Sequence, residues 1–372
     1  MIFIDSTYHD FVSRTADKKV IVFGASSLWH YYLRIFPHLE KDVINRTLFI
    51  VDNDSSKCGM ESKIGENAVE IRKVDELLGQ NDYIILIAVS MAYQAEICEQ
   101  LMGMGLAEGT ECYSLPLMIY GKDKADNSCV EPYFAIHSVE QIPAKIHRFW
   151  FSREEKPDIY KKCIESWHRY CPDYELIEWN ADNYDISKNR YMEQAYESRK
   201  WAFVSDYARL DVIFEHGGIY LDMDVELIAP IDRLRNATAF FCRQEDGFVE
   251  LGSGFGAASG NRLIKEMLDV YRDVEFVDSR GVMDVTPQPE RLSRVLERNN
   301  IRICHDSQVI NDMVFLSNEY IVCDVRPETM GRMESKLGIH WHNAGWHNEK
   351  DKYVIKKSIE ARQALLERYF KQ

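Results

Sequence analysis

Long apolar runs and a cysteine framework are both missing from this sequence. The strongest apolar run, Tyr83–Val89, is far shorter than the roughly 20 residues that cross a bilayer. The nine cysteines are scattered, odd in number and never form a Cys-x-x-Cys pair, so neither structural zinc nor a disulfide framework is expected. Met1–Ser6 also lacks the basic start and apolar core of a signal peptide. We therefore predict a protein that is cytoplasmic or peripheral at the inner face of the membrane.

A positive charge surplus is missing as well. Lys and Arg number 45 against 60 Asp and Glu, which gives a formal net charge of −15 and argues against a nucleic-acid partner. Hydrophobic residues make up 46% and charged residues 28%, a balance that excludes wholesale disorder. The length of 372 residues predicts two ordinary domains or one large domain.

Short β-branched runs alternate with helical segments in the first third of the chain. Such runs predict a parallel sheet covered on both faces, and the expected strands are Val20–Phe23, Leu48–Val51 and Tyr83–Val89. Lys122–Ser128 is polar, aperiodic and of mixed charge, so we place a linker there. The expected domains are residues 1–125 and 126–372.

A glycine follows the first expected strand, but the full Gly-x-Gly-x-x-Gly fingerprint is absent from Val22–Ser27. The stretch Val51–Asp54 is similar to Rossmann-like domains attached to other sugar-modifying enzymes. Residues 1–125 are therefore expected to form a Rossmann-like α/β domain. Gly24 and Asp52 leave two roles open for it: a cofactor site, or a structural or partner-docking unit.

Two aspartates follow a buried strand in the second domain. Ile219–Leu221 runs into Asp222 and Asp224, and because strand side chains alternate, the two carboxylates should point to one side. Such a pair repels unless a cation lies beside it, and oxygen ligands favour Mg²⁺ or Mn²⁺. The alternative is a solvated turn with two unrelated acids.

A helix expected over Val204–Glu215 precedes this strand and ends at Gly217 and Gly218. Asp206 and Arg209 are spaced by three on it and so share one face. Their alternative interpretation is a surface ion pair of little energetic value.

The combined pattern resembles glycosyltransferase family 32, the Asp-x-Asp sugar transferases. That family includes yeast-type initiating mannosyltransferases and bacterial capsule enzymes, and its layout is shared with the clostridial glucosylating toxins. The resemblance covers about Ile146–Ile231, and the bacterial polysaccharide members are most similar. It is carried by Lys145–Phe151, Cys163–Trp167, Pro172–Glu175, Trp179–Asn180, Asn183–Asp185, Ala202–Arg209 and Gly217–Asp224.

The resemblance implies a GT-A domain over residues 126–372, a nucleotide-sugar donor, an Mn²⁺ or Mg²⁺ cofactor and retention of anomeric configuration. The implied catalytic set is Asp206, Arg209, Asp222 and Asp224. Asp206 and Arg209 would hold ribose or donor-sugar hydroxyls, Asp222 would lie near the ribose and the metal, and Asp224 would ligate the metal directly. Trp150 would lie beside the nucleotide base.

A second cluster, His340–Trp346, matches the family's closing segment through His340 and Trp346, whereas Gly345 replaces the usual serine. If this segment is extended, His340 and His342 face one way and complete the metal shell, and Trp346 contacts the donor. The alternative is a packed aromatic and histidine loop. Gly252 or Ser253 stands where relatives often carry asparagine, and Glu245 or Asp246 could stabilise positive charge on the sugar ring.

The expected reaction moves a hexose from a nucleotide sugar to a polysaccharide or lipid-linked oligosaccharide, with UDP-hexose favoured and GDP-mannose next. From Lys350 onward the chain carries a charge of 7 − 3 = +4, and Ile355, Ile359 and Leu366 mark one helix face. That helix either rests on an anionic membrane or packs on its own domain. Rival functions are a metal-dependent phosphotransferase or nucleotide-sugar hydrolase, and a non-catalytic nucleotide-sensing scaffold. The oligomeric state is left open.

Overall fold

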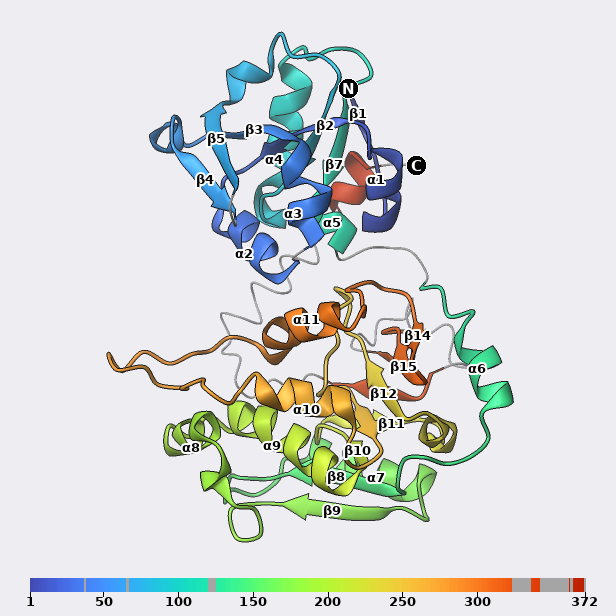
Figure 1. Cartoon of the computed structure of the whole chain (residues 1–372). Helices are drawn as coiled ribbons and strands as arrows, with labels where there is room; N and C mark the ends of the chain where they lie inside the picture. Colours follow the sequence, from blue (N-terminus) through green and yellow to red (C-terminus); the bar gives the residue numbers. More distant parts are fainter. Residues whose placement is uncertain are drawn as a thin grey trace. The chain divides into compact units, whose positions relative to one another are not determined.

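The computed structural model describes residues 1–36, 38–64, 67–119, 125–322, 336–341, 361 and 364–370. The chain divides into two units, which are described separately (Figure 1). The first comprises Met1–Asp123 together with His347–Gln372, and the second comprises Lys124–Trp346.

The first unit is a sheet of seven strands with helices on its faces (Figure 1). In spatial order the strands are β1 (Ile2–Phe3), β7 (Glu111–Ser114), β6 (Tyr83–Ile87), β2 (Lys19–Phe23), β3 (Thr47–Asp52), β5 (Asn67–Lys73) and β4 (Glu61–Ile64). All neighbours are parallel except β4 and β5. The helices are α1 (Tyr8–Arg14), α2 (Ser27–Ile35), α3 (His38–Asp42), α4 (Met91–Gly103) and α5 (Leu115–Ile119). The order reverses between β2 and β6, as in doubly wound sheets, which confirms the Rossmann-like expectation.

The expected strands fall within or largely on β2, β3 and β6, because these strands are buried on both faces. Gly24 follows β2 with φ +111°, and a Cβ there would collide with Val89. The Asp52 carboxylate accepts hydrogen bonds from the Ala25 N–H at 2.8 Å and from Lys57 Nζ at 3.1 Å. Asp52 therefore fixes the loop after β2, which is a structural role.

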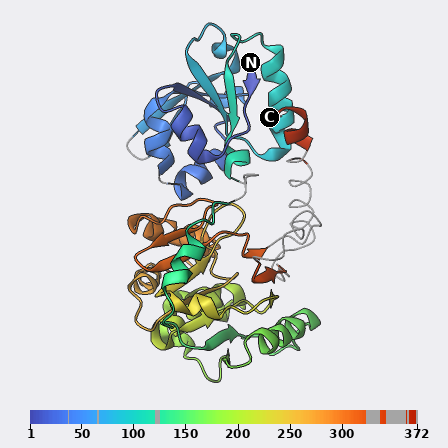
Figure 2. The same ribbon diagram turned by 90° about the vertical axis from the view of Figure 1, so that its right-hand side faces the viewer.

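The end of the chain belongs to the first unit, which differs from the domain limits expected from the sequence. Leu365, Leu366 and Phe370 are buried in the core cluster of this unit, and the Phe370 ring lies 5.3 Å from that of Phe3. Figure 2 shows the C-terminal helical segment lying with the first unit. The sequence suggested that Leu366 faces either a membrane or its own domain, residues 126–372. Burial against the first unit takes Leu366 off any membrane-facing surface, while Ile355 and Ile359 lie outside the described residues.

The second unit contains a mixed sheet of seven strands and a smaller sheet of three. The larger sheet runs β14 (Gln308–Ile310), β15 (Met313–Leu316), β12 (Ala239–Cys242), β13 (Phe255–Ala257), β10 (Gly218–Tyr220), β8 (Lys145–Phe149) and β9 (Glu175–Trp179). The smaller sheet runs β11 (Val225–Leu227), β17 (Gly338–His340) and β16 (Ile321–Val322). The helices are α6 (Val130–Ile136), α7 (Asp158–Tyr170), α8 (Arg190–Glu197), α9 (Trp201–His216), α10 (Arg262–Asp269) and α11 (Gln288–Arg298). The α/β class expected for both units is confirmed.

The passage from α9 into β10 positions the candidate site. Gly217 ends α9 with φ +62°, and its N–H donates to the Ile213 carbonyl at 2.9 Å. Buried His147 on β8 donates from Nε2 to the Gly217 carbonyl at 2.9 Å and accepts from Trp179 Nε1 at 3.0 Å. A Cβ on Gly218 would lie 2.9 Å from His147 Nε2, so the turn needs glycine to pack on β8 this closely.

Two further expectations concern the membrane and the thiols. Among the helices in the described part of the chain, none combines the length and apolar character that a membrane span requires. Eight cysteines are described, and each is a free thiol.

Candidate metal and donor site

Asp222 and Asp224 lie in a turn rather than on the strand. β10 ends at Tyr220, and the Val225 N–H donates to the Asp222 carbonyl at 3.0 Å, which closes the turn. The alternation of strand side chains, from which the sequence argument started, therefore does not apply here. The carboxylates converge because the chain folds back at once into β11.

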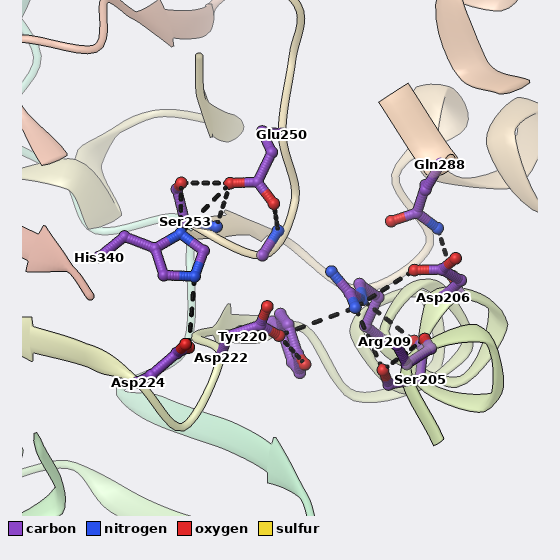
Figure 3. Close-up of polar contacts among 12 residues, drawn as sticks. Ser205, Asp206, Arg209, Tyr220, Asp222, Asp224, Glu250, Ser253, Gln288 and His340 are labelled. Carbon is purple, nitrogen blue, oxygen red and sulfur yellow. Dashed lines mark hydrogen bonds and ion pairs between the residues drawn. The ribbon is translucent and has the colours of Figure 1, made fainter. Parts of the chain in front are cut away.

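Pairing of β11 with β17 brings a histidine to the two aspartates. The strands are antiparallel with Val225 opposite His340, and the Trp341 N–H donates to the Asp224 carbonyl at 3.0 Å. His340 Nε2 lies 3.2 Å from Asp224 Oδ1 (Figure 3). One ligand atom each from Asp222, Asp224 and His340 lies within 4.8 Å of the others.

This donor set fits a divalent metal ion. Two carboxylate oxygens and one imidazole nitrogen are ligands that Mn²⁺ accepts, and three protein ligands leave positions for waters or phosphate oxygens. The structure thus brings together three of the four predicted metal ligands. The fourth, His342, lies outside the described residues.

Asp206 and Arg209 form a buried ion pair beside the aspartates. Arg209 Nη2 lies 3.2 Å from Asp206 Oδ1 and 3.7 Å from Asp222 Oδ1, and the two residues are 8% and 5% exposed. The surface-pair interpretation was therefore wrong. Burial raises the pKa of Asp206 to about 6, Arg209 opposes the rise, and Asp222 adds to it.

Comparison with known proteins agrees with this geometry. Residues 157–241 match the family described as "Glycosyltransferase sugar-binding region containing DXD motif", and the DXD here is Asp222-Met223-Asp224. A curated relative is inositol phosphoceramide mannosyltransferase 1 of Schizosaccharomyces pombe, 24% identical over 180 residues. The second unit is thus similar to DXD glycosyltransferases over the stretch that carries Asp222 and Asp224.

The match spans only part of each protein. It covers 45% of this chain and 52% of the yeast relative, so the chain spans about half the length of the curated protein it matches. Among solved structures, the PaToxG glycosyltransferase is 18% identical over 46% of this chain and 74% of its own, with a TM-score of 0.34. A glycosyltransferase involved in glycosylation of the major capsid of PBCV-1 is 12% identical over 57% and 98%, with a TM-score of 0.31.

Two tyrosines lie near the aspartates and were not singled out from the sequence. Tyr220, the last residue of β10, donates its hydroxyl to Asp222 Oδ1 at 2.5 Å, and its ring lies 4.9 Å from the Arg209 guanidinium. Tyr160 on α7 has a raised pKa, first through burial and then through the charges of Asp224 and Asp222. Tyr220 could have been suspected from its place two residues before Asp222, whereas Tyr160 carried no local signal.

Trp150 follows β8, at the same carboxyl end of the sheet as Asp222 after the parallel neighbour β10. Its Nε1 donates to the Glu154 carbonyl at 3.1 Å, and its ring meets Tyr160 edge-on at 5.6 Å. Trp150 therefore contacts Tyr160, whose pKa is in turn raised by the charges of Asp224 and Asp222. The other predicted donor contact, Trp346, lies outside the described residues.

A carboxylate that the sequence analysis did not single out reaches the site from the loop before β13. Glu250 accepts from the N–H groups of Gly252 and Ser253 at 3.1 and 2.8 Å. The Ser253 hydroxyl contacts both Glu250 Oε2 and His340 Nδ1, the latter at 2.9 Å (Figure 3). Of the two acids suggested from the sequence, Glu245 and Asp246, the second stabilises a turn by accepting from the Phe248 N–H at 3.2 Å.

Proposed function

We propose that this protein is a glycosyltransferase that moves a hexose from a nucleotide sugar to a saccharide or lipid-linked saccharide, with a divalent metal held by Asp222, Asp224 and His340. The observation that carries the proposal is the convergence of those three ligand atoms within 4.8 Å. Buried Arg209 lies 3.7 Å from Asp222 and so adds a fixed guanidinium beside the metal ligands. The metal ion and the guanidinium together would balance the negative charge of a bound diphosphate.

Each residue then has a proposed role. The metal, when bound, supplies Lewis-acid stabilisation of the departing diphosphate. Asp206 and Arg209 bind ribose or sugar hydroxyls, because carboxylate and guanidinium together offer acceptors and donors. Tyr220 orients Asp222 through its 2.5 Å hydrogen bond, and Trp150 stacks on the base.

Asp206 and Glu250, the two carboxylates near the proposed metal ligands, already form ion pairs or hydrogen bonds within the protein. Asp206 is held by Arg209 at 3.2 Å, and Glu250 by the backbone of Gly252 and Ser253 at 3.1 and 2.8 Å. The family resemblance implies retention of anomeric configuration, and because these acids are engaged we propose front-face transfer without a covalent sugar–enzyme intermediate rather than a double displacement on one of them.

The donor and acceptor are proposed from resemblance. UDP-hexose is favoured on the resemblance to bacterial polysaccharide members of the family, and an acceptor in capsule or other polysaccharide synthesis would follow. The yeast relative's name speaks of mannosyl transfer to a phosphoceramide, which keeps GDP-mannose and a lipid-borne acceptor as the second candidate. Cytoplasmic localisation and peripheral membrane contact remain proposals from charge and composition.

The test is a donor panel on the full chain stripped of metal. UDP-glucose, UDP-galactose and GDP-mannose are each added with and without Mn²⁺, and the melting temperature and released nucleoside diphosphate are measured. One donor should raise the melting temperature and turn over only with metal, and NMR of the product should show a retained anomeric configuration.

The panel also separates the rivals. A phosphotransferase or nucleotide-sugar hydrolase would give no glycosylated acceptor, and a sensing scaffold would bind donor without turnover. Full activity in excess EDTA would refute the metal assignment.

A further inference from the structure

The loop from Glu250 to Ser253 contacts both sides of the proposed metal site. The Asp222 N–H donates to the Gly252 carbonyl at 3.0 Å, and Ser253 Oγ lies 2.9 Å from His340 Nδ1. A Cβ on Gly252 would collide with Asp222 Oδ2 and with Glu250 Oε1. Only glycine lets the backbone approach the aspartate this closely, so the loop is built to lie against the site.

Hydrogen bonding within this loop fixes where one proton lies. Ser253 has a single hydroxyl proton, and its Oγ is hydrogen-bonded to Glu250 Oε2. An ionised carboxylate can only accept, so Ser253 donates this proton to Glu250. Toward His340, Ser253 Oγ can then only accept, which requires a proton on His340 Nδ1.

The other nitrogen of the ring faces the aspartate. With Nδ1 protonated, neutral His340 has its lone pair on Nε2, which lies 3.2 Å from Asp224 Oδ1. A lone pair and a carboxylate oxygen at that distance repel, and a cation between or beside them removes the repulsion. His340 is only 4% exposed, so its ring is held in this orientation by packing.

We propose that Glu250 and Ser253 are positioning residues that select the Nδ1–H tautomer of His340 and aim its Nε2 at the metal. The inference rests on the proposed metal site and adds the groups that make His340 a ligand. Histidines that bind metals generally give their second N–H to a carboxylate or another acceptor, which raises their basicity and fixes the ring. Here the acceptor is a serine hydroxyl polarised by a carboxylate.

The test compares Co²⁺ and Mg²⁺ binding to the full chain by calorimetry, with metal salts alone. Ser253→Ala should raise the Kd for Co²⁺ about 10–100-fold. Mg²⁺ should be affected less, because it prefers oxygen ligands and water, so the preference for Co²⁺ over Mg²⁺ falls. The matched control is Ser293→Ala on α11, which removes a buried hydroxyl bonded to the Glu290 carbonyl at 2.7 Å. The control should keep the wild-type preference.

A second variant covers the case in which Ser253→Ala does not fold, as judged by circular dichroism. Glu250→Gln keeps the side-chain volume but leaves one oxygen for three donors, and it should also lower the Co²⁺ preference. Equal weakening of both ions, or no change in either variant, would overturn the proposal. Wild type that binds neither ion would remove the proposed metal site and this inference together, whereas tight wild-type binding with an unchanged variant removes the inference alone.

Discussion

The buried His147 should make the second unit sensitive to acid. Its Nε2–H donates to the Gly217 carbonyl and its Nδ1 accepts from Trp179, so the neutral ring satisfies both neighbours. Burial lowers the pKa of His147 from 6.5 to about 4, partly opposed by the bond to Gly217. The folded state therefore prefers the neutral ring, and His147 contributes its full stability above pH 6.5.

The size of the effect follows from the two pKa values. The gap between 6.5 and about 4, at roughly 1.36 kcal/mol for each pH unit, corresponds to about 3 kcal/mol. Because the unfolded chain binds the proton first, the free energy of unfolding falls as the pH drops below 6.5, and about 2.5 kcal/mol of it is gone by pH 4.5.

The assay is urea unfolding at pH 7.5 and 4.5, followed by tryptophan fluorescence. Every tryptophan except Trp29 lies in the second unit, so the signal reports chiefly on that unit. His147→Gln should lower stability at pH 7.5, yet lose about 2.5 kcal/mol less than wild type on acidification. His168→Gln, which removes an exposed histidine on α7, is the control. An equal acid-induced loss in wild type and His147→Gln would refute the argument.

Four further predictions concern the site and its unit. Asp224→Asn should abolish turnover with the fold intact, and retention of more than about a tenth of kcat/KM, a loss under roughly 1.4 kcal/mol, would contradict direct ligation. Arg209→Lys should lower kcat/KM about 10–100-fold, because an ammonium cannot replace the planar guanidinium that contacts both Asp206 and Ser205. A wild-type kcat/KM in steady-state kinetics would mean that Arg209 is only structural. Gly252→Ala should weaken Mn²⁺ binding at least tenfold and cost about 1–3 kcal/mol of unfolding free energy by overpacking, measured by calorimetry and urea unfolding. Residues 124–346 alone should bind the donor, and a soluble, folded truncation without affinity in calorimetry would reassign Gly24 and Asp52 to ligand binding.

The choice of that truncation shows where sequence reasoning about domains failed. Apolar positions such as Leu366 predicted a helix face, but nothing local in the sequence says which sheet Leu366 covers. In the structure Leu366 is buried with strands of the first unit. A truncation that removes residues 1–123 but keeps the C-terminus would leave those side chains without their core, and aggregation would follow.

The strands of the first unit were easier to predict. Val20–Phe23 and Tyr83–Ile87 are continuous apolar runs. A strand that is buried on both faces can be predicted from such a run alone, without knowing which strands pair with it. Glycine placement was equally readable: Gly217 ends α9 with positive φ because few other residues tolerate that conformation. Buried strands and helix ends could thus be predicted from short segments of sequence.

Only those site residues that lie close together in sequence could be grouped by sequence analysis. Asp222, Asp224 and the helix bearing Arg209 lie close together in sequence, so motif spacing was enough to group them. His340 was suspected from resemblance, and what places it is the register of β11 with β17, a pairing across more than a hundred residues. No periodicity in either three-residue strand encodes that register.

The role of Glu250 could not be predicted from the sequence, because it depends on segments that meet only in the folded chain. A glutamate three residues before a serine is unremarkable in any sequence. It acquires a role because the Gly252 carbonyl bonds to Asp222 while Ser253 meets a histidine that arrives from β17. Three separate segments must be in place before the proton on His340 Nδ1 is determined, and each is fixed by a backbone hydrogen bond or a strand register. Substitutions that shift any one segment, even far from the metal ligands, should therefore weaken metal binding by disturbing this hydrogen-bonded chain.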